Sequence, residues 1–452
     1  MKSILLPLFF GSFSLITSSQ VQIRTLPLPG YEERIIEFID EMTIIDTHEH
    51  LLNPIKIQQN SSLDFMLLLH HYSSGDIESA GMSSKIFQML LKDSLPPLEK
   101  WRILKPFWEG SFNTAYNRVA LLTAQKLFGV NDINESTVSD LSDKIKKAYQ
   151  TDWFNKVLID KCKIEYLIQD DWDHNRTFEN ERFKYVDRFD NFISISSKQM
   201  INAIEKQENI KIETIDEFVQ ALEKAFNTAM KNGIVGVKTG LAYSRILHYE
   251  NVNKERAQKV FEELMNSSGG KKLSFAEVKP FQDYMMHRVL DLARQHNLPL
   301  VIHTGLLAGN GNIIENTNPI HLVNLFKEYP DVNFILYHGS FPYGSELTTL
   351  AKNNRNVYID MCWLYVISPS YSERYLHEWI ETVPASKIMA FGGDYNNIEN
   401  VYGHLLFAKQ IISKVLIAKV KDGYLNESEA KNIARMILHD NAEKLYKLPS
   451  KL

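Results

Sequence analysis

The chain has 452 residues, which suffice for one large barrel or two ordinary domains. Hydrophobic residues make up 44% of it, so it can bury a sizeable core. The net charge is −5 with acidic and basic residues well mixed, and the lack of a basic stripe or a long acidic tract argues against a nucleic-acid partner and a disordered tail.

The amino terminus has the composition of a secretory signal peptide over residues 1–19. Lys2 precedes an apolar stretch from Ile4 to Ile16, and small or polar residues follow up to Gln20. The stretch is too short for a stable membrane span. We therefore expect an exported protein, periplasmic or secreted, whose mature chain begins near Gln20. An ordinary buried amino-terminal segment is the alternative.

Helical periodicity dominates the regions on both sides of the first expected strand. Residues 31–41 are expected to form a helix, and residues 43–46 the first strand. A long segment of roughly residues 52–160 then has helical spacing and few strand signals. Helices are expected there at Leu63–Tyr72, Ser83–Leu91 and Asn113–Phe128. We expect this segment to be a helical insertion after strand one.

Strand-like runs alternate with helical stretches along the rest of the chain. They are expected at Cys162–Gln169, Phe183–Phe189, Gly233–Lys238, Pro299–His303, Asn333–His338, Val357–Met361 and Ile388–Phe391. Such alternation implies a parallel sheet, and eight units favour a closed barrel. The alternative, an open doubly wound sheet, usually has a glycine-rich turn after its first strand, and none follows Asp46. The predicted fold is therefore α/β, a distorted (β/α)₈ TIM barrel over residues 20–452.

Histidines and an aspartate stand at the ends of three of these strands, where barrel active sites are built. His48 and His50 are two residues apart, so on a strand both side chains point the same way. His303 ends strand five, and Asp394 follows strand eight, which neighbours strand one in a closed barrel. Together they suit a divalent cation, most simply one Zn²⁺ ion, with a second ion as an alternative. Taken singly, a histidine is more often structural, and an aspartate could cap a helix.

Other ionisable residues near strand ends have more than one interpretation. His338 ends strand six and suits a general acid/base beside the metal, with ligation of a second metal as the alternative. Lys238 ends strand four and could bind an anionic substrate group, bridge two metals if carbamylated, or simply reach solvent. Arg188 and Arg245 could hold a substrate carboxylate bidentately, although arginines in loops are usually solvated.

Cysteines and tryptophans carry weaker signals. Cys162 and Cys362 fit no zinc-binding spacing, and each is expected to be a small buried hydrophobe. Core packing is the more common fate of large aromatic residues, but a substrate wall could be formed by Trp101, Trp108, Trp172 and Trp363.

The strand-end residues resemble those of the amidohydrolase superfamily, most closely its amidohydrolase-related branch near the uronate isomerases. The resemblance runs from about Ile35 to Leu448 and is carried by Asp46-Thr47-His48-Glu49-His50, Ile302-His303-Thr304-Gly305, Tyr337-His338-Gly339-Ser340-Phe341-Pro342 and Phe391-Gly392-Gly393-Asp394. It implies a distorted (β/α)₈ barrel with a divalent metal, usually zinc. It also implies metal binding by His48, His50, His303 and Asp394, and catalysis by His338 beside the metal.

The function expected from these residues is metal-dependent hydrolysis of an amide, ester or lactone in a small molecule. The metal would lower the pKa of a bound water toward about 7. Asp394 would orient that water or carry its proton, and His338 would stabilise or protonate developing charge. One alternative is a decarboxylase or a uronate (sugar-acid) isomerase on the same scaffold, and a second is an exported metal-site binding protein without turnover. The substrate stays open, and so does a homo-oligomer.

Overall fold

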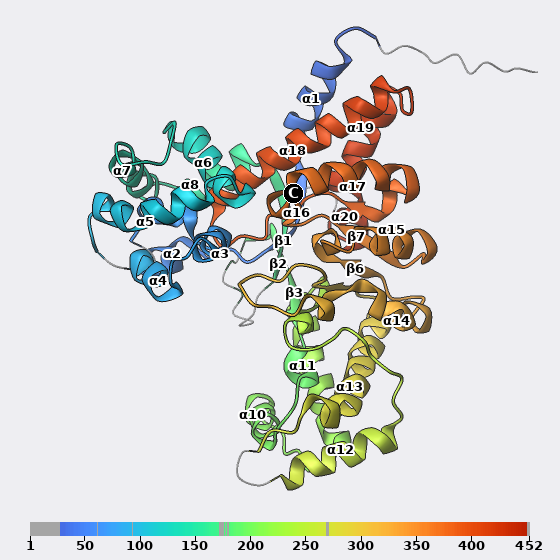
Figure 1. The fold of residues 1–452 in the computed structure, drawn as a ribbon. Helices are drawn as coiled ribbons and strands as arrows, with labels where there is room; N and C mark the ends of the chain where they lie inside the picture. The colour runs from blue at the N-terminus through green and yellow to red at the C-terminus, as the bar shows by residue number, and fades with distance from the viewer. Residues whose placement is uncertain are drawn as a thin grey trace, which may run out of the picture.

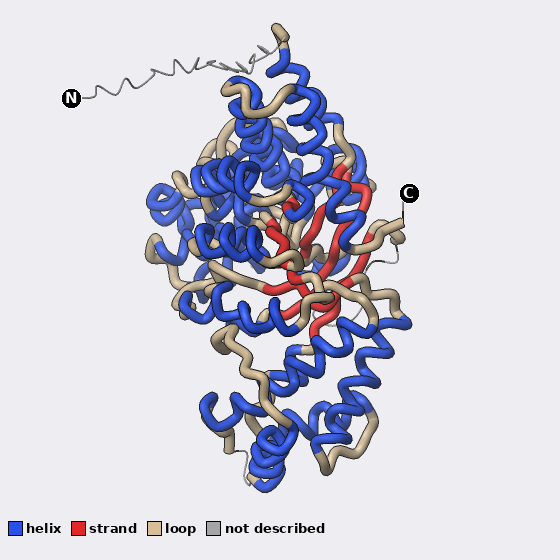
Figure 2. Tube along the Cα trace, turned by 90° about the vertical axis from the view of Figure 1, so that its right-hand side faces the viewer, coloured by secondary structure: helices blue, strands red, loops and turns tan. Residues whose placement is uncertain are grey.

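Eight parallel strands in chain order form the centre of the computed structural model (Figure 2). The structure describes residues 28–449, apart from 61, 93, 171–175, 177, 179 and 268–270. Within these residues the strands are β1 (Ile44–Glu49), β2 (Ile164–Asp170), β3 (Phe183–Arg188), β4 (Gly236–Thr239), β5 (Leu300–Ile302), β6 (Phe334–Leu336), β7 (Val357–Asp360) and β8 (Ile388–Met389). Each pairs in parallel with the next. The predicted α/β barrel is confirmed.

Apolar side chains from all around the sheet fill the barrel interior. Ile45 of β1, Val301 of β5 and Ile335 of β6 are each at most 1% exposed and belong to one inner cluster. Leu445 and Tyr446, close to the carboxyl terminus, belong to the same cluster. The carboxyl-terminal segment therefore completes the packing inside the barrel, which is a filled core and not a pore.

β1 and β8 are joined by backbone that continues beyond the short strand β8. The Thr47 N–H donates to the Phe391 carbonyl at 3.1 Å. The Asp394 N–H donates to the His48 carbonyl at 2.8 Å. These bonds lay the loop after β8 along β1, and they bring Asp394 beside His48.

The helices other than those between β1 and β2 are arranged around the sheet, with those of residues 198–208 and 254–266 beyond it at one end of the molecule (Figure 1). They are α1 (Tyr31–Glu41), α9 (Asp190–Ile193), α10 (Lys198–Glu208), α11 (Ile215–Lys231), α12 (Lys254–Asn266), α13 (Phe275–Gln295), α14 (Val323–Glu328), α15 (Gly344–Asn353), α16 (Leu364–Ile367), α17 (Pro369–Thr382), α18 (Ile398–Lys421), α19 (Glu427–Arg435) and α20 (Asn441–Leu445). α11 starts at a capping box, in which Thr214 and Glu217 bond to each other's backbone N–H. Phe218, Leu222 and Phe226 then recur at helical spacing on its buried face.

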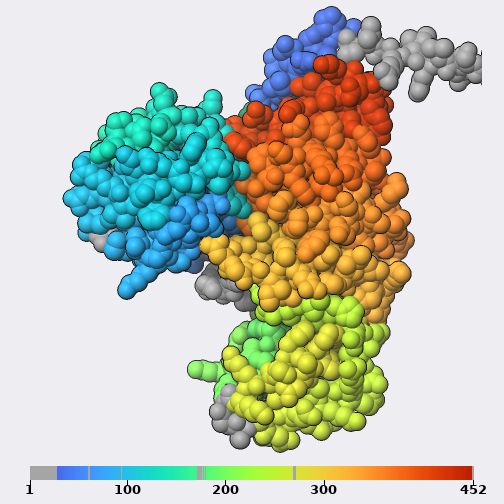
Figure 3. All heavy atoms as spheres, viewed as in Figure 1, coloured from blue at the N-terminus to red at the C-terminus, as the bar shows by residue number. Residues whose placement is uncertain are grey.

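The segment between β1 and β2 forms a helical lobe on one side of the barrel (Figures 1 and 3). Its elements are α2 (Pro54–Asn60), η1 (Phe65–Leu69), α3 (Tyr72–Ser79), α4 (Ser84–Lys92), α5 (Pro97–Ser111), α6 (Ala115–Phe128), α7 (Val138–Ala148), α8 (Trp153–Asn155) and η2 (Lys156–Lys161). The lobe has an apolar cluster of its own, which includes the fully buried Phe87 and Leu104. α6 joins it to the barrel by packing on α16 and α18. The helical insertion after strand one is confirmed.

One helix in the described part of the chain, α18, has the length and apolarity to cross a bilayer. It packs against α1, α6 and α17, and 61% of its most apolar window is buried within the protein. That burial is expected of a helix in the core.

The strand boundaries differ from the prediction at places that matter for the site. β5 and β6 end at Ile302 and Leu336, so that His303 and His338 follow their strands, and β8 ends at Met389 and not at Phe391. The fourth strand begins at Gly236 and not at Gly233, because Gly233 has φ +76° and ends the turn after α11. β1 extends to Glu49, so that His48 lies within the strand. The leader predicted over residues 1–19 lies outside the described residues.

Candidate active site

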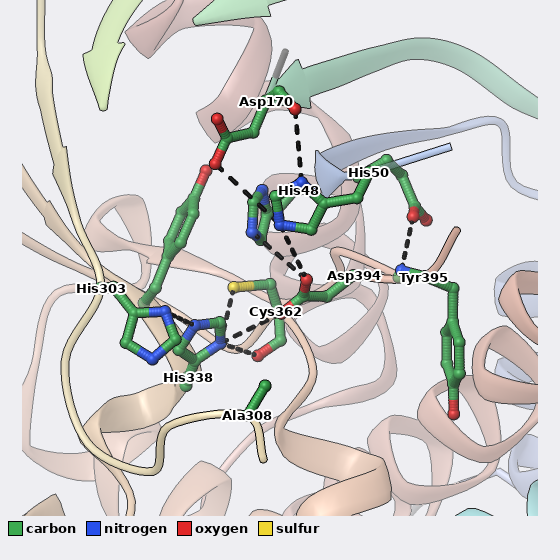
Figure 4. A network of polar contacts seen from close by, with 12 residues as sticks. His48, His50, Asp170, His303, Ala308, His338, Cys362, Asp394 and Tyr395 are labelled. Carbon is green, nitrogen blue, oxygen red and sulfur yellow. Dashed lines mark hydrogen bonds and ion pairs between the residues drawn. The ribbon is translucent and has the colours of Figure 1, made fainter. Parts of the chain in front are cut away.

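Side chains from the ends of β1 and β8 meet at the rim of the barrel (Figure 4). The Nε2 atoms of His48 and His50 lie 3.4 and 3.5 Å from the same carboxylate oxygen, Oδ1 of Asp394. The ligand atoms of these three residues all lie within 4.8 Å of one another. The structure therefore brings together three of the four residues predicted to bind a metal.

The surroundings of this group suit a divalent cation. His48 is 1% exposed, and its Nδ1 has no hydrogen-bond partner among the described residues. Burial, and then the charge of Lys238, holds the pKa of His48 well below its ordinary value, while burial lowers the pKa of His50 to about 4. Both imidazoles are therefore neutral at pH 7, the form that binds metals. Two neutral imidazoles facing a carboxylate fit the cation that the resemblance implies.

His303 lies outside that three-residue group and bonds to His338, with Nδ1 and Nε2 3.0 Å apart. The other nitrogen of each ring lies within hydrogen-bonding distance of a backbone carbonyl oxygen. His303 Nε2 lies 2.9 Å from the Leu306 carbonyl, and His338 Nδ1 lies 3.1 Å from the Cys362 carbonyl. Three hydrogen bonds need three protons, whereas two neutral imidazoles carry two. The pair therefore makes all three bonds only with one additional proton. Burial lowers the pKa of both rings, which makes that proton easy to release.

Three rim residues, His338, Trp363 and Asp394, adopt left-handed backbone conformations, with φ of 64°, 63° and 58°. For residues other than glycine, each such conformation costs about 1–3 kcal/mol and persists only where the surroundings enforce it. Strained residues of this kind gather at functional sites. Burial also raises the pKa of Asp394 to about 7, so this carboxylate can accept and release a proton near neutrality.

A charged cluster of Asp170, Arg188 and Lys238 adjoins the metal group. Arg188 Nε donates to Asp170 Oδ1 at 2.9 Å, and its Nη2 contacts the other oxygen. Lys238 Nζ lies 3.8 Å from Asp170 Oδ2 and has no hydrogen bond within the described chain. Burial lowers the pKa of Lys238 to about 8. Burial alone would raise the pKa of Asp170, but the charge and hydrogen bonds of Arg188 outweigh it and lower that pKa to about 2.

Asp170 is absent from the predicted site, although it lies 4.0 Å from His50 Nε2. It follows the run Tyr166-Leu167-Ile168-Gln169 in the way that His303 follows Leu300-Val301-Ile302. The rule that polar residues at strand ends form barrel sites therefore applies to Asp170 as well.

Arg245, the other arginine predicted to bind substrate, lies in a separate buried cluster. Its Nη2 donates to Asp283 at 2.6 Å and to the His248 carbonyl at 2.9 Å. Its Nη1 donates to Gln282 at 3.0 Å, and its Nε donates to the Ile246 carbonyl at 3.2 Å. All three guanidinium nitrogens thus bind protein atoms and anchor the loop after β4. A role of Arg245 in substrate binding stays a prediction.

The helical insertion adds an aromatic wall that no motif indicates. The rings of Tyr72 and Trp363 are stacked 4.3 Å apart, and Tyr116 stacks 5.3 Å from Tyr72. The Tyr72 hydroxyl is within hydrogen-bonding reach of Asp394. Burial, and then the Asp394 charge, raises the pKa of Tyr72 well above its ordinary value. Tyr72 and Tyr116 lie far from the strand ends in sequence, so no spacing rule could identify them.

The remaining tryptophans and the cysteines have mainly structural surroundings. Trp101 and Trp108 pack in the core of the insertion, and Trp172 lies outside the described residues. Cys162 and Cys362 are free and buried, as expected. The Cys362 sulfur lies 3.4 Å from His338 Nδ1.

The fold and the residues at the rim identify the superfamily of the protein. A (β/α)₈ barrel with His-x-His on its first strand and an aspartate after its eighth belongs to the amidohydrolase superfamily, and an amidohydrolase family profile matches residues 264–448. The glucuronate isomerase profile matches residues 32–317, which is more than half of the chain. The chain belongs to the glucuronate isomerase family.

Two curated relatives match about half of the chain. Protein fluG of Emericella nidulans is 28% identical over 223 residues, which cover 48% of this chain and 26% of that protein. A uronate isomerase of Caldanaerobacter subterraneus is 25% identical over 244 residues, which cover 51% of this chain and 49% of the relative. The chain thus spans at most about half the length of these relatives.

A crystal structure of uronate isomerase from Thermotoga maritima matches the fold along the whole molecule. Its TM-score is 0.76 at 18% sequence identity, over 93% of this chain and 98% of that one. At this identity the likeness establishes the shared fold.

These comparisons correct the predicted function. The main expectation, hydrolysis of an amide, ester or lactone, is wrong, because the family shown for this chain is an isomerase family. The same rim could activate water or hold a hydroxy-carbonyl compound, so the motif residues alone do not separate the two chemistries. The hydrolase class is thus replaced, and the stated isomerase alternative is favoured. Nothing in the comparisons supports the predicted signal peptide and secretion.

Proposed function

We propose that this protein interconverts the aldehyde and ketone forms of a uronate such as glucuronate. The observation that carries the proposal is the glucuronate isomerase match over residues 32–317, which contains His48 and His50. The geometry agrees, because a buried carboxylate and a protonatable histidine pair stand side by side at this rim. Lys238, whose Nζ has no hydrogen-bond acceptor among the described residues, lies in the same site.

His48, His50 and Asp394 are the residues that would hold the divalent cation, and zinc is the ion we propose. When bound, such a cation polarises the carbonyl group of the substrate. His303, which is held by His338, stays a further candidate ligand.

Aldose–ketose isomerisation moves one hydrogen between neighbouring carbons and one between their oxygens. Asp394 Oδ1 faces His48 and His50, whereas Oδ2 lies 3.7 Å from His338 Nδ1. We assign to Oδ2 the removal of the proton on C2 and its return to C1. A pKa raised to about 7 by burial suits a group that must both take and give this proton.

The oxygen proton is assigned to the pair of His303 and His338. His338 gives the shared proton to the carbonyl oxygen on C1, which yields an enediol, and it recovers a proton from the hydroxyl on C2. The proton count thus balances after both transfers. Giving up the shared proton replaces the bond between the two rings by a bond to substrate, while the bonds to the Leu306 and Cys362 carbonyls keep both rings in place.

Lys238 is assigned to the substrate carboxylate. Its Nζ is buried 3.8 Å from Asp170 Oδ2 and 3.8 Å from the centre of the Tyr337 ring, but it makes no hydrogen bond among the described residues, and a buried donor without an acceptor is costly. A substrate carboxylate would supply the missing acceptor. Arg188, bound to Asp170, adds positive charge on the same side of the site.

The test is an assay of the purified protein on hexuronates in D₂O, followed by NMR. Proton transfer through a side chain that exchanges with solvent should place deuterium on the carbon next to the new carbonyl, which is the hydroxymethyl carbon when the ketone form is the product. His48→Ala should lose both activity and bound metal, while the exposed His248→Ala should keep both. Absence of keto–aldo exchange on every hexuronate by metal-loaded protein would refute the proposal.

A further inference from the structure

The loop that carries Asp394 is tied to β1 by three consecutive backbone amides. The Gly393 N–H donates to Asp46 Oδ1 at 3.1 Å. The Asp394 N–H donates to the His48 carbonyl at 2.8 Å. The Tyr395 N–H donates to Glu49 Oε2 at 2.8 Å. Two of these three acceptors are side-chain carboxylates, so the usual pairing of strand backbones does not account for them.

The carbonyl groups of this loop are also held, because the Trp363 N–H donates to the Gly392 carbonyl at 3.0 Å and the His50 N–H donates to the Tyr395 carbonyl at 3.1 Å. Asp46 and Glu49 act on its amide groups, beyond the end of the strand. β8 has only two residues and ends at Met389, five positions before Asp394. Asp394 itself has φ +58°, a conformation that residues other than glycine leave unless neighbouring contacts enforce it. The amides on both sides of Asp394 are the ones bound by Asp46 and Glu49.

The fit between Glu49 and Gly393 is tight. A methyl group on Gly393 would overlap Glu49 Oε1, so only glycine leaves room for this carboxylate. Glu49 and Asp46 are both fully buried. Asp46 Oδ1 also accepts from the His48 N–H at 3.2 Å, so the same carboxylate touches both backbones that carry the metal group.

We propose that Glu49 and Asp46 are positioning residues, which hold Asp394 against His48 and His50 by binding the amides on either side of it. The catalytic role of this positioning rests on the proposed function. Groups that orient the residues around a metal change its affinity by about 10- to 100-fold when they are removed.

Two variants break the contact between Glu49 and the loop, and one preserves it. Glu49→Met has a similar size but offers no oxygen to the Tyr395 N–H. Gly393→Ala displaces Glu49 without changing any acceptor. Glu49→Gln keeps an amide oxygen for the same bond. Gly110→Ala is the matched glycine control, because its added carbon meets only the Ala80 side chain, at 3.5 Å.

The metal affinity is measured by chelator competition, and the geometry by the visible spectrum of the Co²⁺-loaded protein. Glu49→Met and Gly393→Ala should bind metal about 10- to 100-fold more weakly and show a changed spectrum. Glu49→Gln and Gly110→Ala should match the wild type in both. Thermal unfolding of each variant identifies any loss that comes from misfolding alone.

Wild-type affinity and spectrum in Glu49→Met would overturn the proposal. An equal loss in Glu49→Gln and Glu49→Met would overturn it too, because it would show that the hydrogen-bond acceptor is not what matters. Crystals of metal-free wild type and Glu49→Met provide a second measure, the φ of Asp394 and its distance to His48. None of these readouts uses a uronate, so a failure of the proposed isomerase activity is distinguished from a failure of this inference.

Discussion

The rim at β1 and β8 and the helical insertion form adjoining parts of one site by different means. At the rim, the side chains come from strand ends and are fixed by backbone hydrogen bonds, so His48 and Asp394 approach within 3.4 Å. The insertion supplies Tyr72 and Tyr116 from α3 and α6, which also contribute to a separate apolar core, although these two rings pack with the barrel cluster. The difference suggests a division of labour, in which the rim sets the chemistry and the insertion shapes the space for the substrate.

The largest effect that this division predicts is at Asp394. Asp394→Asn keeps the size of the side chain but removes the base, so kcat on a uronate should fall by about 10²- to 10⁴-fold. Asp140→Asn, an exposed carboxylate of the insertion paired with Lys144, should leave kcat unchanged. Steady-state kinetics with metal analysis measures both. A similar kcat for Asp394→Asn and the wild type would show that the rim carboxylate does not act as the catalytic base.

A cavity in the core of the insertion should lower the stability of the protein without lowering its content of bound metal. Leu104→Ala removes a fully buried side chain from the insertion core and should lower the free energy of unfolding by about 2–5 kcal/mol. KM should rise because the aromatic wall loosens, while the metal content stays at the wild-type value. Denaturant unfolding, kinetics and metal analysis test this expectation. If Leu104→Ala lost metal as readily as it lost stability, the two regions would not be separable.

This contrast also explains how much the sequence could predict. The strands and the residues His48, His50 and Asp394 follow local rules, namely a two-residue period and polar residues at strand ends. The pairing of His303 with His338 depends on how two loops turn after β5 and β6, which no spacing encodes. The choice between hydrolysis and isomerisation does not follow from the motif residues, and Tyr72, which lies beside Asp394, comes from a distant helix.

The rim should also dominate the pH dependence of stability, through Asp360 as well as its neighbours. Asp360 is fully buried at the end of β7, and burial raises its pKa to about 7. Since the folded pKa exceeds the unfolded one, its contribution to stability is complete below pH 4 and is lost as the pH rises through 7. In metal-free protein, Asp360→Asn should reduce the fall in unfolding free energy between pH 5 and 8 by up to about 3 kcal/mol.

Denaturant unfolding of chelator-treated protein at pH 5, 6, 7 and 8 measures this difference. Asn can still accept the 2.8 Å bond from the Cys362 N–H, so the variant changes the titration and preserves that contact. Part of the dependence should remain, because burial also raises the pKa values of Asp46 and Asp394 to about 7. Identical pH profiles for Asp360→Asn and the wild type would contradict the expectation.

The smallest effect tests a polar contact between the two regions, the one between Tyr72 and Asp394. Tyr72→Phe keeps the ring stacked on Trp363 and removes only the hydroxyl beside Asp394. One hydrogen bond contributes about 0.5–1.5 kcal/mol, so kcat should fall by roughly 2- to 13-fold with KM unchanged. Tyr72→Leu should also raise KM, because it removes the stacked ring, whereas the exposed Tyr424→Phe should change neither constant. A rise in KM with unchanged kcat in Tyr72→Phe would show that the hydroxyl binds substrate and does not act through Asp394.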